Sequence, residues 1–328
     1  MKTRVLVTDG LGKEGLELLK THPNFEVVVR DQTSASELSE LAPKFDALII
    51  RTPTKITRDV LTSAPRLKLV VSSGAGFDNI DTKAAREKTV VVMNCPTANS
   101  LSAAEHTIGL FFALARHIPQ SNTSLRLGKW ERDEPFYGTE LHGKVLGIIG
   151  LGNVGKIVAE KAMALGMLVL AYDSAVPALS FLPEKFKYLE MRFKLCRSQS
   201  EVLREADWVT LHIPKEERNI DLLNATTIGE MKRGTYLLNV SRGGIVNEAA
   251  LLEALRSGHL RGAACDVFAS EPPNFESDPI MGLLAHPAFI GTAHLGGATT
   301  ECRERIAAMA AKQTLAFFND GARMGVVN

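Results

Sequence analysis

The chain alternates short apolar runs with segments of helical periodicity. Its first part holds five continuous, β-branched runs, at residues 4–9, 25–30, 46–51, 67–73 and 90–95. Such runs are typical of strands in a parallel sheet whose two faces are both covered. The segments between them, 13–22, 34–42, 57–64 and 82–88, have helical spacing, most with Ser, Thr or Asp near their starts. Strand–helix–strand repetition predicts a parallel sheet with right-handed crossovers.

The alternation then pauses and restarts. A long helix is predicted over 100–118, followed by a polar arm with aromatic residues over 127–143. Six further strand-like runs follow, at 144–150, 168–173, 207–212, 235–241, 262–267 and 288–292, and a last helix is predicted over 299–318. The expected fold class is therefore α/β, with two doubly wound parallel-sheet domains.

Domain boundaries follow from this grouping. We expect one domain at residues 1–98 with 298–328, and the other at residues 99–297. The C-terminal helix is assigned to the first domain because the second group already has its set of strands.

Composition excludes several classes of partner. A formal net charge of +1 over 328 residues offers no field for nucleic acid or an anionic membrane. The four cysteines show no CxxC pair and no histidine at metal-ligand spacing, so we expect no metal and free thiols in a reducing cytoplasm. The apolar N-terminal run is too short for a signal peptide, and residues 108–115 are too short to span a bilayer.

A glycine-rich turn opens the second group of strands. Gly150, Gly152 and Gly155 form G-x-G-x-x-G between an apolar strand and a helix. The first glycine permits the tight turn, the second leaves no Cβ between backbone and a pyrophosphate, and the third lets helix and strand pack closely. The helix N-terminus offers unpaired N–H groups and a positive dipole to the phosphates.

The next strand ends in Asp173, at the distance expected for a residue that binds ribose hydroxyls. A 2′-phosphate at this place would meet a carboxylate, and Ser174 follows where an arginine would suit NADP. The pattern therefore predicts NAD as the cofactor. The alternative is a glycine-rich turn that binds no ligand.

Three later strand ends carry polar side chains. Arg242, Glu271 and His294 each follow an apolar strand, and ligands of open α/β sheets bind beyond the carboxyl ends of the strands. The guanidinium can hold a carboxylate through two hydrogen bonds, and the imidazole can exchange a hydroxyl proton near neutral pH. A carboxylate beside the imidazole orients the ring and raises its pKa. Together with a hydride-accepting cofactor, these groups suit oxidation of a carbon that bears oxygen.

Each residue also has a structural interpretation. Arg242 can neutralise a helix end, Glu271 can be a solvated loop acid, and His294 can be a structural histidine. The three together, after a dinucleotide-binding turn, favour the functional interpretation. His212, which also follows a strand, is a further candidate to flank the cofactor, with Pro214 beside it.

Nearly the whole chain resembles the D-isomer-specific 2-hydroxyacid dehydrogenase family, and within it the catalytic core of the phosphoglycerate dehydrogenases. The resemblance is carried by segments such as "SLSAAEHTIGLFFALAR", "GKWER", "GTELHGKVLGIIGLGNVG", "NVSRGGIVNEAALLEAL", "CDVFASEPP" and "HLGGATTE". It implies a flavodoxin-like substrate domain and a Rossmann NAD-binding domain, with catalytic residues at Arg242, Glu271 and His294. It also implies a homodimer or homotetramer joined through the long helix and the "GKWER" arm.

The resemblance further assigns binding residues. The NAD contacts fall on Asn153, Val154, Asp173, Val240, Ser241, Arg242, Asp266, His294, Gly296 and Gly297, besides the turn glycines. The substrate carboxylate falls on Arg242 and on backbone N–H groups of Ser73, Gly74, Ala75 and Gly76.

One departure from the family pattern concerns a substrate phosphate. Phosphoglycerate dehydrogenases often carry an arginine where this chain has Ser72, which leaves Arg51 and Lys55 as candidate phosphate partners. The expected activity is NAD-dependent interconversion of a D-2-hydroxyacid and a 2-oxoacid, with D-3-phosphoglycerate first. The alternatives are a glyoxylate or hydroxypyruvate reductase, favoured by Ser72, and a non-enzymatic NAD(H) sensor that resembles the related corepressors.

Overall fold

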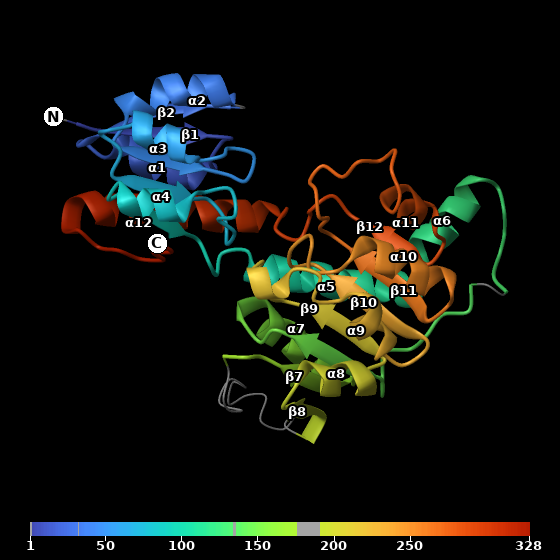
Figure 1. The fold of residues 1–328 in the computed structure, drawn as a ribbon. Coiled ribbons are helices and arrows are strands. Elements are labelled where there is room, and N and C mark those ends of the chain that lie inside the picture. Colours follow the sequence, from blue (N-terminus) through green and yellow to red (C-terminus); the bar gives the residue numbers. More distant parts are fainter. Residues whose placement is uncertain (1, 32, 134–135, 176–190) are drawn as a thin grey trace. The chain divides into compact units, whose positions relative to one another are not determined.

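The computed structural model describes residues 2–31, 33–133, 136–175 and 191–328. Its contacts divide the chain into two compact units, one of Met1–Ser100 with Gly297–Asn328 and the other of Leu101–Gly296. Each unit is built around its own parallel sheet (Figure 1).

The first unit holds a five-stranded sheet in the order β2-β1-β3-β4-β5. The strands are β1 (Thr3–Thr8), β2 (Phe25–Arg30), β3 (Ala47–Ile50), β4 (Leu69–Ser72) and β5 (Val91–Asn94), and all pair in parallel. This order is that of the flavodoxin-like doubly wound fold. Its topological switch point lies between β1 and β3, the place where such folds bind ligands.

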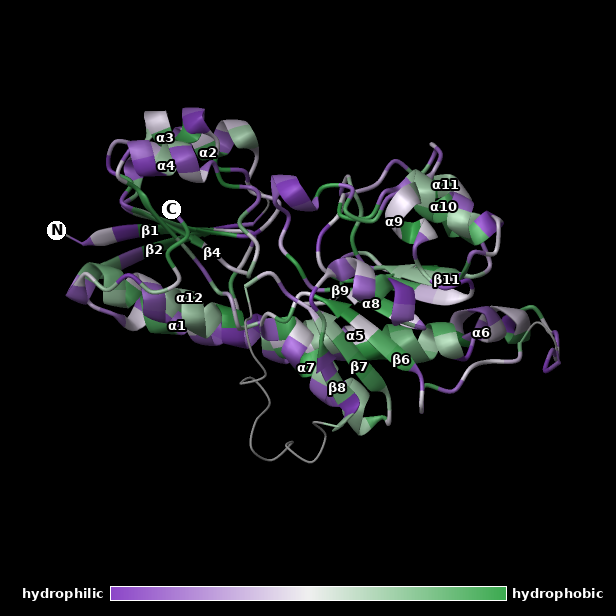
Figure 2. Cartoon of the chain, turned by 60° about the horizontal axis from the view of Figure 1, so that its bottom comes forward, coloured by the Kyte–Doolittle hydropathy of each residue, from purple (hydrophilic) through white to green (hydrophobic). Residues whose placement is uncertain are grey.

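Helices cover both faces of this sheet (Figure 2). On one face lie α1 (Lys13–Thr21) and α12 (Thr300–Asp320), whose buried Leu19, Ala310 and Ala311 pack against the strands. On the other lie α2 (Ala35–Leu41), α3 (Arg58–Ser63) and α4 (Thr82–Glu87), with the short 3₁₀ turn η1 (Ala42–Lys44). The hydrophobic residues face the sheet because burial of apolar area drives the packing.

The second unit holds a seven-stranded parallel sheet in the order β12-β11-β10-β9-β6-β7-β8. Its strands are β6 (Val145–Ile149), β7 (Leu168–Tyr172), β8 (Phe193–Leu195), β9 (Trp208–Leu211), β10 (Thr235–Asn239), β11 (Leu260–Cys265) and β12 (Phe289–Gly291). Numbered from β6, this is the Rossmann order 3-2-1-4-5-6 with one strand added. The predicted α/β fold class with two doubly wound sheets is confirmed.

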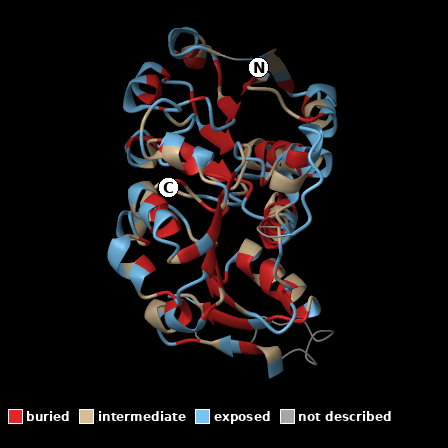
Figure 3. Cartoon of the chain, turned by 90° about the vertical axis from the view of Figure 1, so that its right-hand side faces the viewer, coloured by how far each residue is buried: buried red, intermediate tan, exposed pale blue. Residues whose placement is uncertain are grey.

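Two hydrophobic cores flank this second sheet. One contains α5 (Ser100–Ala115) and α7 (Asn153–Ala164). The other contains α8 (Gln199–Glu205), α9 (Ala225–Gly229), α10 (Glu248–Arg256) and α11 (Ile280–Ala285). The central strands are buried almost throughout (Figure 3), which explains their unbroken apolar sequences.

One predicted helix boundary was wrong, and one strand was missed. The helix expected over 100–118 ends at Ala115, because His117 has a left-handed φ of 51° and a new helix, α6 (Ile118–Arg126), follows with Pro119 in its first turn. Strand β8 was not predicted, because its three residues are too few, and Lys194 too polar, to give an apolar run. The predicted arm at 127–143 includes residues 134 and 135, which lie outside the described residues.

Neither a membrane-spanning helix nor a metal-binding group of side chains occurs in the described part of the chain. Within residues 2–31, 33–133, 136–175 and 191–328, no helix is long and apolar enough to cross a bilayer. In the same ranges, no group of three or more His, Cys, Asp or Glu side chains is placed to hold a metal ion.

Candidate active site

The glycine turn between β6 and α7 has the geometry that a bound dinucleotide needs. Gly150 has a φ of +101°, which L side chains rarely adopt, and its N–H donates to the Tyr172 carbonyl at 2.8 Å. A Cβ at Gly155 would lie 2.0 Å from the Gly150 carbonyl oxygen, so only glycine lets α7 approach the turn. A Cβ at Gly152 would meet no atom within 4 Å, so this side of the turn faces open space at the helix N-terminus.

Asp173 follows β7 and braces this turn. Its Oδ2 accepts a hydrogen bond from Leu151 N at 2.7 Å, and its Oδ1 accepts one from Ala175 N at 2.7 Å. Each carboxylate oxygen keeps a second acceptor position, which suits a ribose hydroxyl. These residues therefore fit the adenosine and pyrophosphate part of NAD, with Asn153 and Val154 in the first turn of α7.

The two glycines give a paired test. Gly152→Ala is expected to leave the melting temperature unchanged but to weaken NADH binding, because its Cβ enters the open space at the helix N-terminus. Gly155→Ala is expected to lower the melting temperature by several degrees, because its Cβ overlaps a carbonyl. Thermal unfolding and fluorescence titration with NADH measure both effects. Equal effects of the two variants on stability would contradict this assignment.

His294 and Glu271 form a hydrogen-bonded pair beyond β11 and β12. The distance from His294 Nδ1 to Glu271 Oε2 is 2.7 Å, and both side chains are partly exposed. The hydrogen bond from Glu271 raises the pKa of His294 above its ordinary value, against the opposing effect of burial. Burial by itself would raise the pKa of Glu271, but the hydrogen bond from His294 leaves it lowered. Since Nδ1 is held by the carboxylate, Nε2 is the atom that can exchange a proton with a ligand.

An apolar cavity of about 390 Å³ adjoins this pair. His294 and Glu271 form part of its wall, together with Phe268, Phe275 and Leu284. Apolar surroundings strengthen the electrostatic coupling within the pair, because they keep bulk water from part of it.

The backbone that carries His294 is held in an uncommon conformation. His294 has a φ of +54°, and its N–H donates to the Asp266 carbonyl oxygen at 2.8 Å. The Asp266 carboxylate accepts further bonds from Leu295 N at 2.7 Å and Gly296 N at 2.8 Å. A left-handed residue of this kind persists only where its surroundings fix it, and such residues cluster at functional sites.

Two more side chains complete the Asp266 network. The Thr292 hydroxyl donates to Asp266 Oδ1 at 2.5 Å, and His106 Nε2 on α5 lies 3.3 Å from the same oxygen. Asp266 is only 1% exposed. Burial by itself would raise its pKa, but the hydrogen bonds from His106, Thr292 and the backbone leave it lowered. The family resemblance implies a cofactor contact at Asp266; the structure adds that Asp266 anchors the His294 loop. His106 and Thr292 were not predicted to take part.

Arg242 lies in the turn after β10. Its Nη1 donates to the Ser241 carbonyl oxygen at 2.8 Å, and its own carbonyl oxygen accepts from Asn239 Nδ2 at 2.9 Å. The charge of Arg242 lowers the pKa of His294, and the two residues follow the carboxyl ends of β10 and β12, which flank β11 in the same sheet. The structure therefore brings Arg242, Glu271 and His294 together at one sheet edge.

The structure puts the other predicted cofactor residues in three places. Val240, Ser241 and Gly296 are buried, and a Cβ at Gly296 would lie 3.1 Å from Asp266 Oδ2 and 3.3 Å from Val240 Cγ1. Gly297 instead belongs to the first unit, where it lines a different cavity. Pro214 is exposed at the end of the β9 segment.

His212 is a poor candidate for proton exchange. Burial lowers its pKa to about 3, so the ring is neutral at physiological pH. Its Nε2 lies 3.1 Å from the Thr210 hydroxyl, and the peptide carbonyl of His212 lies against Gly150. His212 therefore packs against the glycine turn from the end of β9, the strand that neighbours β6.

The predicted substrate residues lie in the first unit. Arg51 and Ser73 line a cavity of about 310 Å³, whereas Lys55 is exposed and is not among its lining residues. In the loop after β4, Ser73 N donates to the Ile50 carbonyl and Gly74 N donates to the Ser72 carbonyl.

The same loop leaves two donors for a carboxylate. Within the described residues, the N–H groups of Ala75 and Gly76 have no hydrogen-bond acceptor. The Ser72 hydroxyl closes the loop by donating to the Gly76 carbonyl at 2.7 Å, and Asn94 Nδ2 donates to the Ala75 carbonyl at 2.7 Å. Of the four N–H groups expected to bind the substrate carboxylate, only those of Ala75 and Gly76 are therefore available as donors.

Glu271→Gln tests the coupling of the pair. Because Glu271 raises the pKa of His294, its loss is expected to move the acid limb of the kcat/KM profile for hydroxyacid oxidation to lower pH. In the reductive direction, which needs the protonated ring, activity at neutral pH is expected to fall. Glu276→Gln, which neutralises an exposed acid of the same loop, is the control. It is expected to leave the pH profiles of both directions unchanged. A Glu271→Gln profile with an unmoved acid limb would contradict the coupling.

Comparison with known proteins identifies the class. The family described as "D-isomer specific 2-hydroxyacid dehydrogenase, NAD binding domain" matches residues 108–296. The chain therefore belongs to the D-isomer specific 2-hydroxyacid dehydrogenase family. The predictions of this family and of NAD as its cofactor are confirmed.

Three similar proteins illustrate its place in the family. The D-3-phosphoglycerate dehydrogenase of Bacillus subtilis is 40% identical over 99% of this chain, which spans 59% of that relative's length. The hydroxypyruvate reductase of Thermotoga maritima is 39% identical over 92% of this chain and 94% of its own. The crystal structure of the TT0316 protein from Thermus thermophilus covers 99% of this chain and 100% of its own, with a TM-score of 0.87 and 34% identity.

Proposed function

We propose that the chain catalyses the NAD-dependent interconversion of a D-2-hydroxyacid and a 2-oxoacid, with D-3-phosphoglycerate as the leading substrate. The observation that carries this proposal is the 2.7 Å pair of His294 and Glu271 in the same unit as the glycine turn. The D-3-phosphoglycerate dehydrogenases among its relatives support the substrate.

Each catalytic residue has a separate task in this proposal. The Arg242 guanidinium holds the substrate carboxylate and polarises the neighbouring C–O bond. In oxidation, His294 Nε2 accepts the hydroxyl proton while the C2 hydrogen leaves with its electron pair as hydride; in reduction the imidazolium returns the proton. Glu271 stabilises that imidazolium through Nδ1. When bound, NAD supplies the hydride acceptor.

A screen of 2-oxoacids with NADH tests the proposal. Phosphohydroxypyruvate, hydroxypyruvate and glyoxylate are compared with pyruvate by the loss of NADH absorbance, and D-3-phosphoglycerate is assayed with NAD in the reverse direction. The proposal expects turnover with at least one of these acids. Negligible turnover of all of them, with binding of a protein partner that depends on NADH, would favour the sensor alternative.

A second candidate is a hydroxypyruvate or glyoxylate reductase. The Thermotoga maritima relative, matched over nearly its full length, supports it, as does Ser72, whose buried hydroxyl supplies no charge for a phosphate. A higher kcat/KM for hydroxypyruvate than for its phosphorylated counterpart would favour this candidate.

We also propose a homodimer or homotetramer in the cytoplasm. Large exposed hydrophobic side chains gather on α5, α6 and the arm, namely Phe112, Ile118, Leu125, Leu127, Trp130 and Tyr137. Clusters of this kind mark protein interfaces. Four free, buried cysteines agree with a reducing compartment. Light scattering coupled to gel filtration measures the subunit number.

A further inference from the structure

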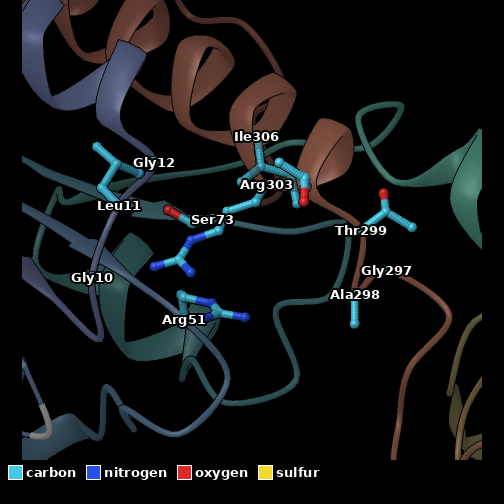
Figure 4. A pocket seen from close by; sticks show the side chains of 11 residues that line it. Gly10, Leu11, Gly12, Arg51, Ser73, Gly297, Ala298, Thr299, Arg303 and Ile306 are labelled. Carbon is cyan, nitrogen blue, oxygen red and sulfur yellow. The ribbon is translucent and has the colours of Figure 1, made fainter.

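A cavity of about 310 Å³ in the first unit lies at the switch point of the five-stranded sheet. Its walls come from the loops that follow β1, β3 and β4 and from the start of α12 (Figure 4). In doubly wound folds this is the place where ligands bind. The described lining residues include two arginines and no acidic side chain: Gly10, Leu11, Gly12, Arg51, Ser73, Gly297, Ala298, Thr299, Thr300, Arg303 and Ile306.

The two arginines reach this cavity from distant parts of the chain. Arg51 follows β3, Arg303 lies in the first turn of α12, and both guanidinium groups project into the same space in Figure 4. Within the described residues, neither guanidinium has a side-chain hydrogen bond or an ion pair. Two like charges that share a cavity repel each other, so the arrangement favours an anion between them. Planar guanidinium groups match phosphate oxygens in two-point contacts.

Other groups around the cavity favour the same ligand. The first turn of the 21-residue helix α12 presents the positive end of its dipole, and Thr299 caps it by accepting from Cys302 N at 3.1 Å. The nearby carboxylate of Asp9 is already engaged, since Oδ2 accepts from the Thr54 hydroxyl at 2.6 Å and from Arg51 N at 3.3 Å. The carboxylates of Asp31 and Glu304 lie close to Gly10 and Gly12 of the same wall. The two guanidinium groups and the helix N-terminus, rather than a net positive charge, therefore favour an anion here.

We infer that Arg303, together with Arg51, binds the phosphate of a phosphorylated D-2-hydroxyacid and sets the preference for that substrate class. The inference rests on the proposed dehydrogenase function and names a residue that sequence reasoning did not consider. Ser72 carries no charge, and its buried hydroxyl already donates to the Gly76 carbonyl, so it does not replace the arginine at this position. Arg303 provides the second charge from α12 instead.

Steady-state kinetics of the full chain with NAD tests the inference. D-3-phosphoglycerate is compared with D-glycerate, which lacks only the phosphate. Arg303→Gln is expected to raise KM for D-3-phosphoglycerate roughly 10- to 100-fold, as for a lost charge-assisted hydrogen bond, with little change in kcat or in the kinetics of D-glycerate. Lys312→Gln, which removes an exposed cation from the same helix, is the control and is expected to change neither substrate.

A second variant and a binding measurement keep the inference separate from the proposed function. Arg303→Lys keeps the charge but not the planar fork, so an intermediate KM is expected. If the wild-type chain oxidises neither acid, the dehydrogenase proposal fails, and calorimetric titration with the two acids still tests the site. Tighter binding of D-3-phosphoglycerate that Arg303→Gln abolishes would support it. An unchanged preference for the phosphorylated acid in folded Arg303→Gln would overturn it.

Discussion

Replacement of His294 by glutamine is expected to lower the turnover number about 10²- to 10⁴-fold, the range that a positioned acid–base group contributes. Glutamine keeps a polar side chain of similar length but cannot exchange a proton near neutral pH. Because His294 is partly exposed and its loop is held through backbone groups, the fold and the binding of NADH are expected to persist. Stopped-flow hydride transfer and NADH titration measure the two properties separately.

The matched control is His286→Gln, a histidine of the loop before β12 whose ring accepts from Ala288 N at 3.2 Å. This variant is expected to keep wild-type turnover. A His294→Gln protein that retains more than a tenth of the wild-type turnover would remove His294 from the chemistry.

Loss of the Asp266 carboxylate is expected to have the largest effect on stability. Asp266→Ala leaves two backbone N–H groups, the Thr292 hydroxyl and His106 without their acceptor in a buried place. The free energy of unfolding is expected to fall by about 3–5 kcal/mol, the cost of breaking a buried charged network. Activity is expected to fall with it, because the left-handed turn at His294 loses its supports. Urea unfolding and kcat measure these two losses.

The loss of stability in Asp266→Ala is expected to depend on pH. Since the pKa of Asp266 is lowered in the folded chain, its contribution is present above the ordinary pKa of an aspartate and is lost as the pH falls through the lowered value. The difference between wild type and Asp266→Ala is therefore expected to shrink in acid. Glu253→Ala, which removes an exposed carboxylate, is expected to change stability by less than about 0.5 kcal/mol. An Asp266→Ala loss equal to that of Glu253→Ala would contradict the network.

Most strands could be predicted from the sequence because burial on both faces forces unbroken apolar runs. The elements that could not be predicted lack this constraint. Edge strand β8 pairs with β7 alone, and its three residues alternate in polarity. The break between α5 and α6 depends on one left-handed residue, His117, in a segment whose apolar pattern continues.

The residues of the site also include some that the sequence could predict and some that it could not. The glycine turn and the polar residues that follow strands could be predicted because topology fixes where strand ends meet. Groups that act from helices could not, since His106 on α5 and Arg303 on α12 are single residues within long amphipathic patterns. Their roles depend on tertiary placement, which no local spacing encodes.

The anchoring of the His294 loop by Asp266 also bears on the thermodynamics of binding. An exposed loop ordinarily loses conformational freedom when a ligand arrives, and that loss is subtracted from the affinity. Here the amides of residues 294–296 are already tied to a carbonyl and a carboxylate at the edge of the core. The loop therefore loses its conformational entropy when the chain folds and not when the ligand binds, so the binding surface is preorganised.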